Sequence, residues 1–412
     1  MTKSIPISGF VKPEFEAVQE AFIENFERRH ELGAACCVYY CGEKVVDLWG
    51  GIRDKATGDP WEENTMVLVS SATKGLAAMA MALGESRGLF DYDERISKYW
   101  PEFTQQGKDK ITIRQLLAHQ GGLYALDERV DTKIEADLDK LAVILARQKP
   151  AWEPGTRQAY HAITLGFYES ELLRRVDPGH RSLGQFFHEE IANPLGLNFY
   201  IGLPEDIPND RLARIQIAIP GVAALKKAPT SLALAVMNPR SRIRRALWGE
   251  LQEDKERIYP RNVEVPSGGG IGTARSIAKA YGVFATGGKE LGLHEETLKQ
   301  LMAPAVPPTR GFYDEVLKLE GMEMSLGFMK PSEKIPFAHP SSFGMLGFGG
   351  SFGFADPYAK IGFAYVPNLN DLFLKDPRQD ALRIAMYRSI GITNPFLWQW
   401  EGALTNFRVS QL

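Results

Sequence analysis

The chain has 412 residues, of which 44% are hydrophobic and 24% are charged, and its formal net charge is −3. These fractions are ordinary for a globular protein and exclude disordered and fibrous classes. The length suggests about two or three lobes. A nucleic-acid partner is not expected, because the chain shows no basic excess or basic stripe. The cysteines Cys36, Cys37 and Cys41 are too few and too clustered for a disulfide framework or a zinc site, so we expect reduced thiols and no metal.

The first ten residues lack the basic start and apolar core of a signal peptide. No run of about 18 apolar residues occurs, so we expect no membrane span. Together these features predict a cytoplasmic protein without a membrane partner. We expect a monomer or a small homo-oligomer that acts on a small molecule.

Periodicity predicts the order of elements along the chain. A helix over residues 12–29 precedes a β-hairpin formed by residues 34–40 and 44–49, and a short apolar run at 67–69 leads into a helix over 71–87. Helical spacing returns at residues 112–117, 137–146, 163–175 and 183–191. Strands are predicted again at residues 343–348, 353–356 and 360–365, followed by a closing helix at 379–389.

Strands at both ends with helices between them predict an α+β fold. We expect an antiparallel sheet built from both chain ends and flanked by helices, with a helical domain inserted into it. The predicted boundaries are 1–68 and 262–412 for the sheet domain and 69–261 for the helical domain. Residues 222–250 are apolar with a basic end and form a candidate lid or pocket wall. The active site should lie where the two lobes meet.

The strongest nucleophile candidate is Ser71, in the S-x-x-K pattern Ser71-Ala72-Thr73-Lys74. Ser71 follows a short apolar run and begins a helix, which places it at the positive end of the helix dipole. Lys74 lies one turn further on the same face. A lysine in an apolar cleft has a lowered pKa and can accept the serine proton. The alternative, a capping serine followed by a solvated lysine, stays open on this pattern alone.

Two other serines occur in catalytic-looking patterns. Ser276 and Lys279 repeat the S-x-x-K spacing, but both are expected off the buried stripe of their helix, so we interpret them as structural. Ser351 lies in a G-x-S-x-G match between two predicted strands. No histidine follows His339, so the order of an α/β-hydrolase triad is not met, and these glycines indicate a tight turn or bulge.

Several blocks together resemble one superfamily: serine β-lactamases, penicillin-binding DD-peptidases and family VIII carboxylesterases. Residues 69–75 (VSSATKG) are similar to its first motif, and residues 88–101 to the stretch that follows. Residues 111–123 (ITIRQLLAHQGGL) and the Gly-rich stretch 268–280 are similar to two further blocks. The blocks cover most of the chain in the expected order. The resemblance implies the β-lactamase-like fold and catalysis by Ser71 and Lys74.

The second motif of class C β-lactamases, Tyr-x-Asn, falls on Tyr160-His161-Ala162, where alanine replaces the asparagine. The resemblance implies that Tyr160, as a tyrosinate or in a proton-sharing pair with Lys74, serves as general base and then general acid. His161 is expected to line the pocket or to pack behind it. His119 is interpreted as a structural hydrogen-bonding residue.

The third motif, Lys-Thr-Gly, falls on Met345, Leu346 and Gly347, so its lysine is missing. That lysine would bind an anionic substrate, and its loss implies a neutral one. We expect these three residues to contact substrate. The backbone N–H groups of Ser71 and Phe348 are expected to form the oxyanion hole.

These residues predict a serine carboxylesterase that hydrolyses short-chain esters through an acyl-enzyme on Ser71, without a cofactor. A β-lactamase or DD-peptidase is the first alternative, and weak β-lactam hydrolysis is compatible with the esterase hypothesis. An acyltransferase would use the same acyl-enzyme and stays open. A non-catalytic scaffold with this fold is disfavoured, because Ser71, Lys74 and Tyr160 occur together.

Overall fold

The computed structural model describes residues 6–217, 234–235, 237–238, 240–247, 257–370 and 376–392. The candidate lid at 222–250 lies mostly outside these residues. Within the described ranges, no helix has both the length and the apolar character needed to cross a membrane.

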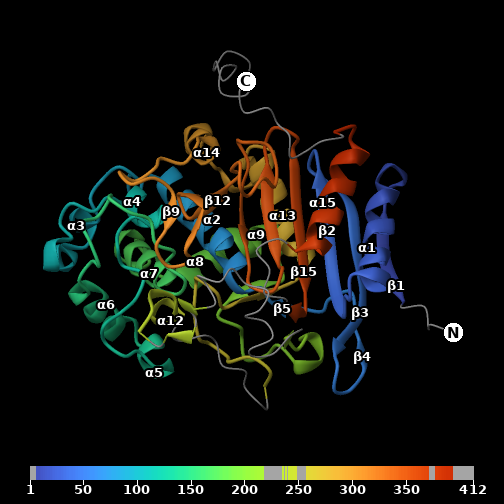
Figure 1. Cartoon of the computed structure of the whole chain (residues 1–412), viewed down its shortest axis with the longest axis horizontal. Coiled ribbons are helices and arrows are strands. Elements are labelled where there is room, and N and C mark those ends of the chain that lie inside the picture. Colours follow the sequence, from blue (N-terminus) through green and yellow to red (C-terminus); the bar gives the residue numbers. More distant parts are fainter. Residues whose placement is uncertain are drawn as a thin grey trace.

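The central sheet is antiparallel and joins strands from both ends of the chain (Figure 1). Its order is β1-β3-β2-β15-β14-β13-β12-β11, with β4 paired to β3. The strands are β1 (Ile7–Val11), β2 (Gly33–Tyr40), β3 (Glu43–Asp54), β4 (Asp59–Pro60), β11 (Glu323–Ser325), β12 (Phe328–Lys330), β13 (Phe343–Leu346), β14 (Phe352–Asp356) and β15 (Ile361–Pro367). The N-terminal and C-terminal parts of the sheet are joined by the pairing of β2 with β15, in which Tyr365 lies opposite Cys36. This confirms the predicted α+β fold with a sheet built from both termini.

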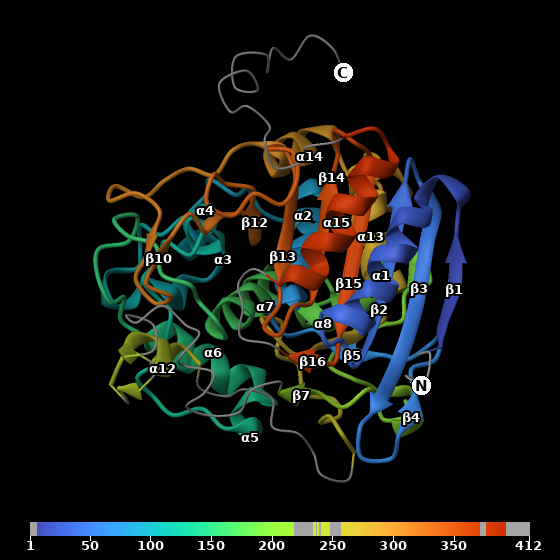
Figure 2. The ribbon, with the colours of Figure 1, turned by 45° about the vertical axis from the view of Figure 1, so that its right-hand side comes forward.

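Helices cover both faces of this sheet (Figure 2). Helices α1 (Glu16–Arg28) and α15 (Pro377–Ser389) lie side by side on one face, and α13 (Ala274–Ala285) packs against β2, β14 and β15 on the other. Every residue of β15 is therefore buried. A strand covered on both sides carries a continuous apolar run instead of an alternating one, as residues 361–367 do.

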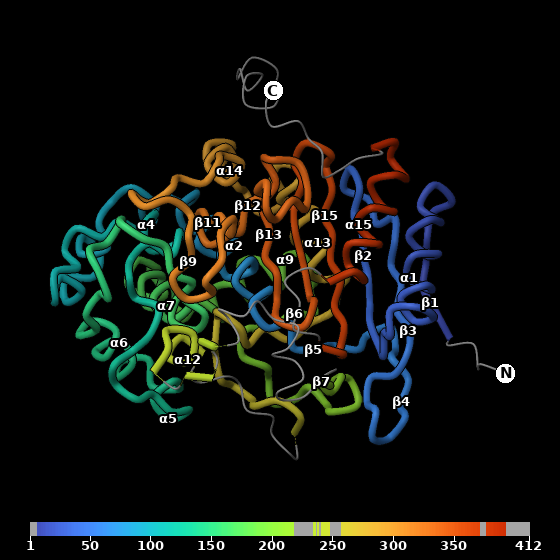
Figure 3. The backbone as a smooth tube through the Cα atoms, in the orientation of Figure 1, coloured from blue at the N-terminus to red at the C-terminus, as the bar shows by residue number. Residues whose placement is uncertain are grey.

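Most of the remaining helices gather beside the sheet, at the left of Figures 1 and 3. They are α3 (Ile96–Tyr99), α4 (Ile113–Leu117), α5 (Thr132–Glu135), α6 (Leu138–Arg147), α7 (Thr164–Val176), α8 (Leu183–Phe187) and α12 (Arg242–Ala246), with α14 (Glu295–Met302) above them. The short helix α9 (Asn193–Leu195) lies nearer the middle of both views, where Lys279 of α13 donates to the Leu195 carbonyl. The described residues also form three small sheets: β5 (Val67–Leu68) with β8 (Gly270–Gly272) and β6 (Phe199–Ile201), β7 (Gln216–Ile217) with β16 (Leu369–Asn370), and β9 (Tyr313–Asp314) with β10 (Leu319–Glu320).

Helix α2 (Thr73–Ser86) lies between the sheet and the helices and packs against α7, α8, α14 and β13. All of its residues except Glu85 are buried. A Cβ at Gly75 would lie 1.9 Å from the Tyr281 hydroxyl, so glycine is needed where α2 approaches α13. The N-terminus of α2 thus lies between the sheet and the helices, where the sequence analysis predicts the active site.

Some elements differ from the sequence expectations. The edge strand β1 and the short strands β11 and β12 were not predicted. The helix expected at 183–191 is α8 followed by a π-helical turn, His188–Ala192. The expectation that Ser276 lies off the buried stripe is wrong, because this residue is only 5% exposed.

Candidate active site

Ser71 lies in a 3-10 turn, Ser70–Ala72, that leads from β5 into α2. Ser70 has φ 48°, a left-handed backbone that is uncommon outside glycine. Thr73 holds this turn: its hydroxyl donates to the Ser70 carbonyl at 2.6 Å and accepts from the Gly270 N–H at 2.9 Å. The turn therefore presents the partly exposed Ser71 at the N-terminal end of the helix.

The Lys74 side chain is completely buried. Its amine lies 3.2 Å from the Ser71 hydroxyl and donates to the carbonyls of Ala162 at 2.6 Å and of Ser267 at 2.7 Å. Two N–H groups of the amine bind the two carbonyls, so the third tetrahedral position of the nitrogen points at the Ser71 hydroxyl. When the amine is neutral, that position is the lone pair that can accept the serine proton.

Burial lowers the pKa of Lys74 to about 7, and the charge of Glu169 opposes this shift only in part. The cause is desolvation, because the direct partners of the ammonium are neutral oxygens. A substantial fraction of the amine is thus unprotonated near neutral pH, as a proton acceptor requires.

Tyr160 lies over the same amine, with its ring centroid 4.8 Å from Lys74 Nζ and its hydroxyl in a hydrogen bond with Ser71. The His119 ring packs against the tyrosine ring at 5.0 Å. The Asp314 carboxylate accepts from the backbone N–H of Tyr160 and so fixes its segment. Burial raises the pKa of Tyr160, and the contact with Ser71 opposes this rise only partly. The side chain is therefore a neutral phenol, and the tyrosinate form considered from the sequence is disfavoured.

The turn after β13 approaches the nucleophile from the sheet side. A Cβ at Gly347 would lie 2.2 Å from the Val69 carbonyl and 3.1 Å from the Ala72 nitrogen, so only glycine fits. The Ser351 hydroxyl donates to the same Val69 carbonyl at 2.8 Å, and the Gly347 N–H donates to the Ser351 carbonyl at 2.7 Å. These contacts join the β13–β14 turn to the turn that carries Ser71.

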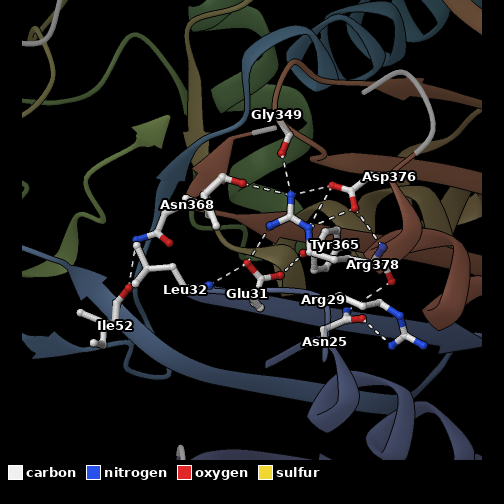
Figure 4. Close-up of polar contacts among 11 residues, drawn as sticks. Asn25, Arg29, Glu31, Leu32, Ile52, Gly349, Tyr365, Asn368, Asp376 and Arg378 are labelled. Carbon is white, nitrogen blue, oxygen red and sulfur yellow. Dashed lines mark hydrogen bonds and ion pairs between the residues drawn. The ribbon is translucent and has the colours of Figure 1, made fainter. Parts of the chain in front are cut away.

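A buried ion-pair network supports the far side of this turn (Figure 4). Arg378 donates to Glu31 at 2.9 Å, to Asp376 at 2.6 Å and to the Gly349 carbonyl at 3.3 Å. A Cβ at Gly350 would lie 2.2 Å from an Asp376 carboxylate oxygen. Burial opposes the charge of Arg378, but Tyr365 and the two carboxylates raise its pKa overall. The network connects α15 and the end of α1 to the turn beside Ser71.

The expected substrate-contacting residues divide into two groups. Leu346 and Gly347 are partly exposed, and Phe348 is 53% exposed. Met345, in contrast, is 1% exposed, and its Cβ would lie 3.3 Å from a Cβ added at Gly75 of α2. His161 is fully buried. The structure therefore places Met345 and His161 behind the site, because the Met345 side chain points toward α2 and the imidazole faces other protein groups.

Both nitrogens of His161 have protein partners. Nε2 accepts from the Leu123 N–H at 2.9 Å, so Nδ1 carries the proton and donates to His119 Nδ1 at 2.9 Å. The backbone N–H of His161 also donates to His119 Nδ1. Burial lowers the pKa of His161 to about 3, so both imidazoles are neutral. The pair is a structural support beneath Tyr160, as expected for His119.

The competing serines are held by structural contacts. Ser276 accepts from the Asn198 N–H at 2.8 Å and lies 2.9 Å from the Thr273 hydroxyl, while Lys279 donates to the Leu195 carbonyl at 2.6 Å. Ser351 is 3% exposed in the turn between β13 and β14, as the glycines indicated.

Four contributors to the site were not found from the sequence: Thr73, Ser267, Asp314 and Glu169. Ser267 acts through its backbone carbonyl, which no residue type signals. Asp314 and Glu169 come from distant segments that only the fold brings near Tyr160 and Lys74. Thr73 lies inside the S-x-x-K pattern, but the pattern does not indicate its bonds to the Ser70 carbonyl and the Gly270 N–H. Among the residues with described positions, no cluster of three His, Cys, Asp or Glu side chains is arranged to hold a metal ion.

The β-lactamase family model matches residues 18–385 of this chain. The chain therefore belongs to the β-lactamase family, and it is a serine hydrolase of that family. The esterase/β-lactamase LipL of Mycobacterium tuberculosis is 31% identical over 380 residues, which covers 90% of this chain and 85% of LipL.

Two solved structures are similar over almost the whole length. A family VIII carboxylesterase is 35% identical, with a TM-score of 0.78 over 93% of this chain and 100% of that one. A penicillin-binding protein homologue from Caulobacter crescentus is 33% identical, with a TM-score of 0.79 over the same shares. The resemblance inferred from the sequence blocks is thus confirmed.

Proposed function

We propose that this protein is a carboxylesterase that cleaves small neutral esters through an acyl-enzyme on Ser71. The observation that carries the proposal is the buried Lys74 amine, which is held by two carbonyls and points at the Ser71 hydroxyl. The similarity to a family VIII carboxylesterase and to LipL supports esters as the substrate class.

In acylation, the neutral Lys74 amine accepts the proton of the Ser71 hydroxyl while Ser71 Oγ bonds to the ester carbonyl carbon. The negative charge that develops on the carbonyl oxygen is stabilised by the backbone N–H groups of Ser71 and Phe348. The bond to the alkoxy oxygen then breaks, and Tyr160 donates its proton to the leaving alcohol. The Lys74 ammonium restores the proton of Tyr160, so the net transfer is from serine to alcohol.

Deacylation runs through the same groups with water in place of the alcohol. Tyr160 and Lys74 together accept a proton from the water as its oxygen bonds to the acyl carbon. The bond from that carbon to Ser71 Oγ breaks, and the ammonium returns a proton to the serine. The products are a carboxylic acid and the free enzyme.

The β13 residues that border the nucleophile favour a neutral substrate. Leu346 at the end of β13 and Gly347 just after it are partly exposed and carry no charge. The half-exposed Phe348 ring adds apolar surface, which suits short acyl chains. Because LipL is described as both an esterase and a β-lactamase, we include slow β-lactam hydrolysis as a side activity.

The pH dependence follows from the state of Lys74. Its pKa is lowered to about 7, and the base must be unprotonated, so kcat/KM should rise with pH through this region. The raised pKa of Tyr160 keeps the phenol protonated in the same range.

A panel of p-nitrophenyl esters of increasing acyl length, run beside a chromogenic cephalosporin, tests the proposal. We expect kcat/KM to be highest for acetate to hexanoate esters and far lower for the cephalosporin. A preference for the cephalosporin over p-nitrophenyl butyrate would contradict the esterase assignment. Leu346→Lys, with Leu346→Gln as its neutral control, should shift the ratio toward the anionic cephalosporin.

A further inference from the structure

Glu169 is a buried acid that the proposed mechanism does not use. It lies on α7 and is completely buried, and neither carboxyl oxygen has a hydrogen-bond partner among the described residues. An ionised carboxylate without a partner is costly inside a protein, because it has lost its water. Consistently, burial raises the pKa of Glu169 to about 8, and the charge of Lys74 opposes the rise.

The position of this carboxyl group relates it to Lys74. A Cβ at Gly327 would lie 2.7 Å from the Ala78 Cβ and 3.3 Å from Glu169 Oε1, so the carboxyl lies beside Ala78 of α2. Ala78 is four residues after Lys74, which places the two on the same face of the helix. The Glu169 carboxyl is therefore buried against the part of α2 that lies about one helical turn after residue 74.

The electrostatic surroundings of Glu169 are sparse. Lys74 of α2 is the charged group that acts on it, and Glu169 is in turn the acid that acts on Lys74. The buried Tyr92 hydroxyl is also influenced by Glu169. Helices α3, α6 and α8 pack against α7 as well, but none of their described side chains exerts a charge effect on this carboxyl. His119 and His161, on the other side of Lys74, are neutral.

We propose that Glu169 is a positioning residue that acts through Lys74, with the two groups titrating as one coupled pair below the nucleophile. This inference rests on the proposed role of Lys74 as the base. When one proton is shared between the groups, it resides either on the carboxyl beside a neutral amine or on the amine beside a carboxylate. The second arrangement leaves the amine without a free lone pair, and the raised pKa of Glu169 favours the first. Above the titration of the carboxyl, the same negative charge stabilises the ammonium that forms as Ser71 attacks.

The test compares the pH profiles of wild type, Glu169→Gln and Glu169→Met with p-nitrophenyl butyrate. At pH 6.5 the wild-type carboxyl is protonated and uncharged, so its removal changes the protonation of Lys74 little. At pH 9 the carboxyl is charged, so its removal takes away the charge that stabilises the ammonium formed during attack, and kcat/KM should fall. We expect the variant-to-wild-type ratio of kcat/KM to be at least threefold higher at pH 6.5 than at pH 9. The methionine variant avoids a buried unpaired amide and covers the case in which the glutamine variant fails to fold.

Glu85→Gln is the matched control, because it also removes one negative charge, here from α2 itself. The hydrogen-bond partners of Glu85 are Thr297 and Gln300, and both can also bond the amide of a glutamine. Its ratio to wild type should be the same at both pH values. A purely structural role of Glu169 would lower kcat/KM equally at all pH values, so a change of less than threefold between pH 6.5 and pH 9 would overturn the proposal. Failure of the proposed function itself would look different: wild type would not hydrolyse the ester.

Discussion

Two buried cations of this protein have opposite surroundings. Arg378, in the first turn of α15, donates to the carboxylates of Glu31 and Asp376 (Figure 4). Lys74, at the start of α2, donates instead to two backbone carbonyls and the Ser71 hydroxyl. Carboxylate partners raise the pKa of Arg378 despite burial. Neutral partners leave desolvation unopposed at Lys74, apart from the partial effect of Glu169, and its pKa falls to about 7.

The difference separates a structural cation from a reactive one. Both side chains are nearly inaccessible to water, so burial alone does not decide the protonation state. The side-chain type and the partner atoms decide it: a guanidinium among ionised acceptors keeps its charge, whereas an ammonium among neutral acceptors can lose its proton. The fold thus places a permanently charged group under the turn after β13 and a titratable group beside the nucleophile.

The largest expected effect comes from making the cation at position 74 permanent. Lys74→Arg keeps the charge, but a guanidinium cannot release its proton near neutral pH. We expect kcat/KM for p-nitrophenyl butyrate to fall by about 10⁴-fold or more, by analogy with the loss of one member of a catalytic unit. Circular dichroism should show an unchanged fold. Activity within tenfold of wild type would rule out a neutral lysine as the base.

Removing the Tyr160 hydroxyl, which is hydrogen-bonded to Ser71, should have the next largest effect. Tyr160→Phe keeps the ring that packs against His119, so the fold should change little. We expect kcat to fall by about 10²–10⁴-fold, the usual range for a positioned acid–base group. A decrease of less than fivefold in steady-state assays would reduce Tyr160 to a packing role.

Stability measurements extend the comparison to the two cations directly. Arg378→Met leaves Glu31 and Asp376 buried without their partner, and we expect a loss of about 3–5 kcal/mol in the free energy of unfolding. Lys74→Met removes the donor to the Ala162 and Ser267 carbonyls and to the Ser71 hydroxyl, all neutral groups, and we expect a smaller loss, about 1–3 kcal/mol. Denaturant unfolding at pH 8 measures both. Equal losses would show that the two surroundings do not differ as described.

The smallest effect is expected at Ser351, whose hydroxyl supports the turn of Ser71 through the Val69 carbonyl. Ser351→Ala removes one neutral hydrogen bond, worth about 1 kcal/mol. If the whole of this loss raises the free energy of the transition state, kcat/KM decreases about fivefold. An inactive but folded Ser351→Ala variant would indicate that this serine takes part in the chemistry.

The sequence predicts the chemical side chains of the site better than their support. Ser71, Lys74 and Tyr160 are recognised because their chemistry requires particular residue types at matching places. The strands β2, β3 and β13–β15 are predicted by β-prone runs, whereas β1 has mostly exposed residues and β11 and β12 have three residues each, too few for a periodic signal. The orientation of Met345 depends on which face of β13 packs against α2, and no motif specifies this. The carbonyls of Ala162 and Ser267, which orient the Lys74 amine, have no sequence signature.

The central claim is that Ser71, activated by a neutral Lys74, is the nucleophile. Treatment of wild type with a p-nitrophenyl phosphonate ester, followed by peptide mapping by mass spectrometry, tests it directly. The account predicts one adduct, on the peptide that contains Ser71, formed at a rate that rises with pH through about 7. The adduct should be absent from Ser71→Ala and should form at least about 10³-fold more slowly in Lys74→Arg, since no base is then free to take the serine proton. An adduct on the peptide that contains Ser351, or an unchanged rate in Lys74→Arg, would contradict the account.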